Sequence, residues 1–122
     1  MLTAVNIDRV AAVIDRQVLT VSEVTQMAEI RFFPRSTGQS DDDYRRFILD
    51  SLIAQALRFR DVERFGAEDV SKDSIEARLL QIQRRFGSPG EFTVALQHAE
   101  LTLDEVRALI KRQLQVESYI QE

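Results

Sequence analysis

The side chains that could carry out chemistry are few in this chain. His98 is its only histidine, and the chain contains no cysteine. Disulfides, thiolate metal sites and a thiol nucleophile are therefore excluded, and a nucleophile paired with His98 would have to be a serine or threonine. No serine lies in a Gly-x-Ser-x-Gly elbow, so we expect His98 to be a surface residue and the chain to contain no catalytic residues.

Acidic residues are frequent, but their spacing does not predict a metal site. Asp41, Asp42 and Asp43 are consecutive, so on a helix they point in different directions, and they do not match a calcium loop. They suit the positively polarised first turn of a helix, where carboxylates are stabilised and remain solvated. There is also no glycine-rich phosphate loop. We therefore expect no bound metal and no cofactor.

Composition excludes two further classes of protein. The net charge is −4 with both signs interspersed, which does not resemble the basic surface of a nucleic-acid binder. No apolar run approaches the roughly 20 residues that a membrane-spanning helix needs. Hydrophobic residues make up 44% and charged residues 30%, as in a globular domain. The N-terminus lacks the pattern of a signal peptide, which fits a cytosolic protein or one whose signal has been removed.

The element that must position everything else is a predicted helix over 41–65. Its apolar residues cover more than half of its circumference, whereas a surface helix needs only one stripe. Ser40 can cap its start, and Gly66 follows its end. We interpret this helix as the central element of the fold. One face carries Tyr44, Ile48, Leu52, Ala56, Phe59 and Val62; Phe47, Leu49, Ile53, Leu57 and Phe65 widen it.

The other elements are marked by their own start and stop signals. Two short β-branched runs around Asp15-Arg16 predict a hairpin over 8–20, which must pack on the helices because an isolated hairpin is marginally stable. Ser/Thr-x-x-Glu capping boxes and a capping serine predict the helix starts. The sequence therefore predicts a single, mainly α domain over 1–122, a helical bundle with a short N-terminal hairpin. Its helices are expected at about 21–33, 41–65, 72–86, 89–99 and 103–121.

Aromatic residues are the remaining candidates for function. The chain has seven phenylalanines, several of them at the ends of predicted elements. Core packing is the default interpretation, and an apolar groove for a partner is the alternative. Phe32 and Phe33 lie beside the loop 34–40, which makes them the best candidates for exposure. Together with Met27, they are our predicted peptide-binding residues.

The order of these signals resembles the N-terminal chaperone domain of SurA-type periplasmic proteins, which are relatives of the parvulin prolyl isomerases. The resemblance covers roughly residues 7–121 and depends on hydrophobic and capping positions. This sequence departs from the family at the hairpin turn, where Asp15-Arg16 replaces an Asn-Gly-like pair, and in having no parvulin domain. The matching stretches are 9–24, 47–57, 65–71 and 101–114.

The resemblance implies an ATP-independent chaperone domain that binds unfolded or extended polypeptide, with outer-membrane proteins as clients and the periplasm as the compartment. It implies no isomerase activity for this chain. A structural dimerisation or assembly module, and the non-catalytic part of a larger parvulin-type isomerase, remain alternatives. Family members return with a C-terminal helix that this chain lacks. We therefore expect the central helix to be incompletely covered and the protein to form a homodimer, with domain swapping through the loop 34–40 as one form of it.

Overall fold

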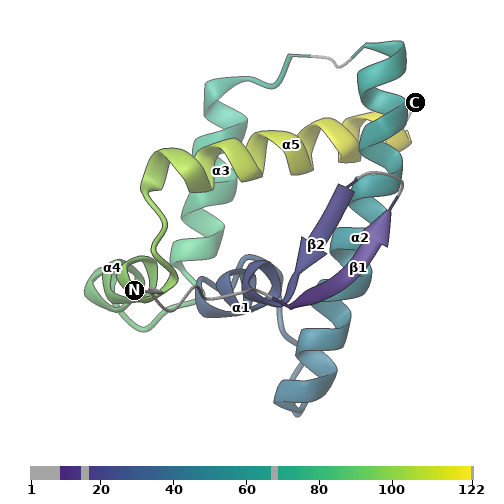
Figure 1. Cartoon of the computed structure of the whole chain (residues 1–122). Coiled ribbons are helices and arrows are strands. Elements are labelled where there is room, and N and C mark those ends of the chain that lie inside the picture. Colours follow the sequence, from purple (N-terminus) through teal and green to yellow (C-terminus); the bar gives the residue numbers. More distant parts are fainter. Residues whose placement is uncertain (1–8, 15–16, 67–68, 122) are drawn as a thin grey trace, which may run out of the picture.

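The computed structural model describes residues 9–14, 17–66 and 69–121, which form an antiparallel hairpin followed by five helices (Figure 1). The expected fold class, mainly α with an N-terminal hairpin and a long central helix, is confirmed. The elements are β1 (Val10–Ile14), β2 (Gln17–Thr20), α1 (Val21–Glu29), α2 (Asp41–Phe65), α3 (Lys72–Gln83), α4 (Pro89–Ala99) and α5 (Leu103–Gln121).

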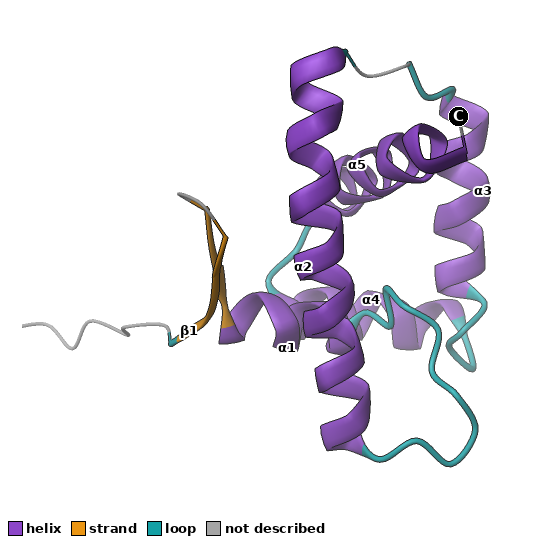
Figure 2. Cartoon of the chain, turned by 90° about the vertical axis from the view of Figure 1, so that its right-hand side faces the viewer, coloured by secondary structure: helices purple, strands orange, loops and turns teal. Residues whose placement is uncertain are grey.

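The longest helix, α2, contacts α1, α5 and β1. Ser40 accepts a hydrogen bond from the Asp43 amide at 3.1 Å, and the three aspartates occupy the first turn, exposed to solvent as expected. Figure 2 shows α5 crossing beside α2, with α1 and α4 near its lower part. The predicted apolar face is the one that packs inward: Tyr44, Ile48, Ala56 and Val62 are buried.

The hairpin packs on α2, which supplies the support that an isolated hairpin lacks. Ile14 and Leu19 are buried against Ala56, and one extra residue in β1 between Val10 and Ala12 produces an irregularity in the register. The expected turn at Asp15-Arg16 lies outside the described residues. The hairpin's second strand leads directly into α1, whose first turn is capped by Thr20.

The predicted end of α1 at Phe33 is wrong, because the helix ends at Glu29. Arg31 adopts a left-handed conformation, with φ of 51°. The Arg31 amide donates to the Ala28 carbonyl at 3.2 Å and the Phe32 amide to the Met27 carbonyl at 3.0 Å, which is a Schellman motif. Arginine is a good helix former, so nothing local in the sequence indicates this stop.

The predicted end of α3 at Phe86 is wrong in the same sense, because α3 ends at Gln83. The Arg85 and Phe86 amides donate to the carbonyls three residues before them, which tightens the chain into a short turn. This turn brings Phe86 against Phe92 of α4 in an edge-to-face contact, with ring centroids 5.4 Å apart. The aromatic contact connects the end of α3 to α4.

One main core joins all five helices. Its fully buried members include Ile30, Ile48, Ile82, Val106 and Ile110. Gln113 is also buried, and its side-chain oxygen accepts a hydrogen bond from Arg78, which is in turn paired with Glu117 at 2.9 Å. Among the described residues, no buried side-chain nitrogen or oxygen lacks a hydrogen-bond partner.

The end of α4 allows a stability test. Glu100 is exposed and left-handed, with φ of 57°, and closes a second Schellman motif. A left-handed conformation costs a non-glycine residue on the order of 1 kcal/mol, so Glu100→Gly is expected to raise the free energy of unfolding by up to about 1 kcal/mol. Urea denaturation measures this change. Glu100→Ala, which removes the same carboxylate but keeps the Cβ, should give no gain; an equal gain from alanine would contradict the backbone explanation.

Candidate functional site

The described part of the chain contains no cluster that suggests a metal centre. No group of three or more histidines, cysteines or acids is placed to hold a metal ion within it. His98 is exposed on α4, as expected. Within the same residues, none of the helices is both long and apolar enough to span a bilayer.

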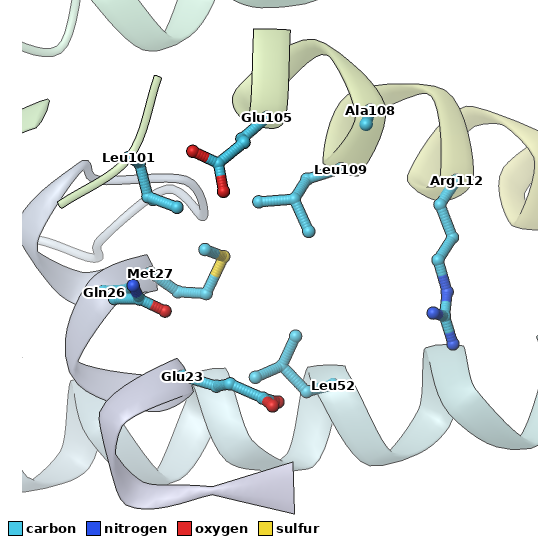
Figure 3. A pocket seen from close by; sticks show the side chains of 9 residues that line it. All are labelled: Glu23, Gln26, Met27, Leu52, Leu101, Glu105, Ala108, Leu109 and Arg112. Atoms are coloured by element: carbon cyan, nitrogen blue, oxygen red, sulfur yellow. The ribbon is translucent and has the colours of Figure 1, made fainter. Parts of the chain in front are cut away.

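An apolar recess lies between α1, α2 and α5 and has a volume of about 470 Å³. We call it the α1–α5 groove. Figure 3 shows side chains from the three helices pointing toward one another across it. Its apolar lining is Met27 from α1, Leu52 from α2, Leu101 from the α4–α5 loop, and Ala108 and Leu109 from α5; its polar lining is Glu23, Gln26, Glu105 and Arg112.

A narrower recess of about 90 Å³ extends the groove toward the hairpin. It shares Met27, Leu52 and Leu109 with the α1–α5 groove and adds Phe32 and Ala56. Leu19 and Gln17 of β2 also line it. The two recesses therefore form one elongated apolar depression, which runs from the start of α5 to the base of the hairpin.

The polar side chains at the edge of the groove are held by hydrogen bonds or ring contacts. The Gln26 amide donates to the Ala99 carbonyl at 2.9 Å, and the Glu105 carboxylate accepts from the Thr102 amide at 3.0 Å. The guanidinium of Arg112 lies 4.2 Å from the centroid of the Phe59 ring. Because these groups are already positioned, an apolar ligand in the groove would not have to order them at an entropic cost.

The three predicted peptide-binding residues are all buried, with exposed fractions of 4% for Met27, 3% for Phe32 and 5% for Phe33. The expectation that Phe32 and Phe33 would be exposed is wrong, because the turn after α1 directs both into the core, where their rings meet edge to face at 5.2 Å. Met27 lines the α1–α5 groove and Phe32 its narrow extension, whereas Phe33 lines a different pocket.

Sequence reasoning missed Leu52, Leu101 and Leu109 as groove residues. Each occupies an apolar position of a helix or of a capping staple, so its sequence signal is the same as that of a core residue. All three are only partly buried, and they pack against the main core from its edge. A pattern of apolar positions predicts which face points inward, but not where the inward faces fail to meet.

A helical domain with an apolar groove and a polar edge has the architecture of a binding module. Comparison with known proteins agrees with this class. No family model and no solved structure matches the chain. The chain is 28% identical over 119 residues to Chaperone SurA from Saccharophagus degradans, in an alignment that covers 93% of this chain and 27% of that protein.

The chain is therefore similar to a SurA-type chaperone over nearly its whole length, which confirms the resemblance inferred from the sequence. The chain spans only about a quarter of the length of the curated relative that it matches. That relative is named as a chaperone.

Proposed function

We propose that this domain is an ATP-independent chaperone module that binds unfolded or extended polypeptide in the α1–α5 groove. The observation that carries the proposal is the groove itself, which has an apolar floor, a polar edge and a volume of about 470 Å³. Peptide and ligand sites typically combine these features. The similarity to a chaperone supports the same role.

The lining favours binding that is weak at each site and tolerant of sequence. Met27 is unbranched and polarizable, so its side chain can adapt to different apolar groups. Leu52 and Leu109 face Met27 without a polar group that would select one partner (Figure 3). In this proposal Met27 contacts the client directly, Phe32 contacts it in the narrow extension, and Phe33 supports the wall from the core side.

We propose outer-membrane proteins as clients and the periplasm as the compartment, on the basis of the family resemblance. The test is aggregation of a urea-unfolded outer-membrane protein, followed by light scattering after dilution. The chain at molar excess should suppress the scattering, and adding ATP should not change the result. An unrelated helical domain at the same mass concentration is the control. No suppression at molar excess would remove the proposal.

A second role, as a dimerisation module, is supported by the incomplete covering of α2. Three large apolar side chains of α2 are exposed: Phe47, Leu57 and Phe65, the last with 69% of its surface. We propose a homodimer in which a second copy covers part of this surface. This surface is separate from the groove, because none of the three residues lines either recess.

Domain swapping through the loop 34–40 would require that loop to open. Opening would break the two hydrogen bonds from Arg35 to the Gln39 carbonyl and the ion pair of Arg35 with Asp41 at 2.7 Å. An unswapped dimer therefore costs less. Light scattering coupled to size exclusion should give a mass near twice that of the chain at micromolar concentration, and Phe65→Ser should shift the equilibrium to monomer. A monomer at every concentration would contradict the dimer.

A further inference from the structure

We propose a second ligand site, in which three arginines bind the carboxylate of a peptide whose neighbouring side chain is apolar or aromatic. The inference rests on the proposed function, because it takes peptide as the ligand class. The site is a pocket of about 430 Å³ that shares no lining residue with the α1–α5 groove or its extension. We call it the arginine pocket; it is lined by Ala28, Arg31, Phe33, Pro34, Arg35, Tyr44 and Arg85.

The charge of this lining is unusual for the chain. Three of its seven residues are arginines and none is acidic, although the whole chain has a net charge of −4. A neighbouring pocket shares Arg31 and Arg35 with the arginine pocket but also contains Glu29 and Asp41, so the excess of positive charge is on the Arg85 side. A concentration of positive charge in a concave site raises the local attraction for an anion.

Arg31 and Arg85 are held by each other's backbone. Arg85 Nη1 donates to the carbonyls of Arg31 at 2.7 Å and Phe32 at 2.8 Å, and Arg31 Nη1 donates to the Arg85 carbonyl. These bonds connect the turn after α1 to the turn after α3. They use Nη1 of each guanidinium, so within the described residues Nε and Nη2 of both keep donors for another acceptor.

The positive charge of Arg85 is not neutralised by a carboxylate of the described residues. The side chain is half-buried, and burial lowers the pKa of its guanidinium because the charged form loses solvation, while nearby Arg78 acts in the same direction. Tyr44 opposes this effect only in part. A bound carboxylate would supply the missing opposite charge, and charge-assisted hydrogen bonds are about twice as strong as neutral ones.

Arg35 completes the positive side of the pocket. Its guanidinium lies 5.1 Å from the centroid of the Tyr44 ring. Its Nε and Nη2 donate to the Gln39 carbonyl, and Nη2 also pairs with Asp41, so within the described residues Nη1 keeps its donors. A ligand carboxylate can therefore bind Arg35 through Nη1 without breaking these bonds.

The remaining walls select the ligand class. Phe33, Pro34 and the Tyr44 ring present apolar surface beside the guanidinium groups. A planar guanidinium binds a carboxylate through two parallel bonds, and the apolar walls suit the side chain next to it. A terminal carboxylate after an aromatic residue and a glutamate after an aromatic residue share this chemistry.

The test compares three peptides that begin with the same five residues, of which the fifth is phenylalanine. One ends in phenylalanine with a free carboxylate, one has the same sequence with a C-terminal amide, and one is amidated with glutamate after the phenylalanine. Calorimetric titration should show that the amidated control binds at least about tenfold more weakly than the better of the two carboxylate peptides, because it cannot form the charge-assisted hydrogen bond. The tighter of the two carboxylate peptides shows whether the pocket prefers a terminal carboxylate or a glutamate side chain. Equal affinity of all three overturns the inference, and so does inorganic phosphate competing as well as the peptide.

Variants and side-chain spectra assign the effect to this pocket. Arg35→Gln should weaken binding of the free-carboxylate peptide by about fivefold to tenfold, and Arg58→Gln, the same charge change at an exposed position of α2, should leave it unchanged. The Nε–H resonances of Arg31, Arg35 and Arg85 should shift on titration. Shifts at the Met27 and Leu109 methyls with the amidated peptide report the groove separately. If the methyl resonances shift but the arginine resonances do not, the inference fails and the proposed function stands. If only the arginine resonances shift, peptide binding in the α1–α5 groove is contradicted and the arginine pocket is supported.

Discussion

An Ala108→Trp protein is expected to keep its fold and to lose most of its suppression of client aggregation. Ala108 is an exposed residue of α5 that lines the α1–α5 groove, so its replacement breaks no buried contact. An indole at this position fills much of a recess of about 470 Å³ and competes with a client side chain for Met27 and Leu109. We expect the concentration needed for half-suppression to rise by about tenfold or more. The reason is that a client can no longer bury one apolar side chain in the filled recess and loses the corresponding binding free energy.

The matched control for this prediction is Ala77→Trp. Ala77 is also an exposed helical alanine, but it belongs to α3 and lines none of the recesses of the groove. The same tryptophan there should leave suppression within about twofold of the unmodified chain, because surface substitutions of this kind have small effects. Equal loss in both variants, or unchanged activity in Ala108→Trp, would show that clients bind elsewhere.

The largest expected effect on stability is that of Ile48→Ala. Ile48 has 0% of its surface exposed and packs in the main core from the N-terminal third of α2. Removing a buried isoleucine side chain to alanine typically costs about 2–5 kcal/mol, because the lost transfer energy is accompanied by a cavity. A small domain has only about 5–15 kcal/mol of stability in total. We therefore expect a large fall in the urea midpoint, followed by circular dichroism at one fixed protein concentration.

Leu57→Ala on the same helix is the control for this measurement. Leu57 is 47% exposed, so its truncation should cost less than about 1 kcal/mol in the monomer. The ratio of the losses in unfolding free energy of the two variants tests which face of α2 packs in the core. Similar losses for both would contradict the observed orientation of the helix, or would show that the second copy buries Leu57; repeating the measurement at higher dilution separates these two explanations.

The elements themselves follow from local chemistry. Capping groups such as Thr102 and Glu105 exchange hydrogen bonds with each other's backbone at 3.1 and 3.0 Å, and Ser40 and Ser71 cap their helices as their positions predict. These interactions join residues three apart, so the sequence alone contains both partners. The same holds for the apolar stripes, because the period of a helix is fixed. Helix starts and the inward faces were therefore predictable.

The ends of α1 and α3 depended on contacts across the fold. Arg31 leaves the helical conformation where its own side chain and backbone exchange hydrogen bonds with Arg85, which is 54 residues away. Local propensity favours continuing the helix at both positions. Because these turns direct Phe32 and Phe33 inward, the mistaken helix end and the mistaken exposure have one cause.

The sequence by itself determined which segments are helical, where most of them begin and which side of each is apolar, because these properties depend on neighbours within one or two turns. It also contained the resemblance to SurA-type chaperones. Only the tertiary structure decided that Met27, Leu52 and Leu109 line a recess while similar residues pack tightly, and that Arg31, Arg35 and Arg85 share one pocket. The reason is geometric: a recess or a charge cluster is a relation between separate helices, set by their packing, and no single helix carries a signal for it.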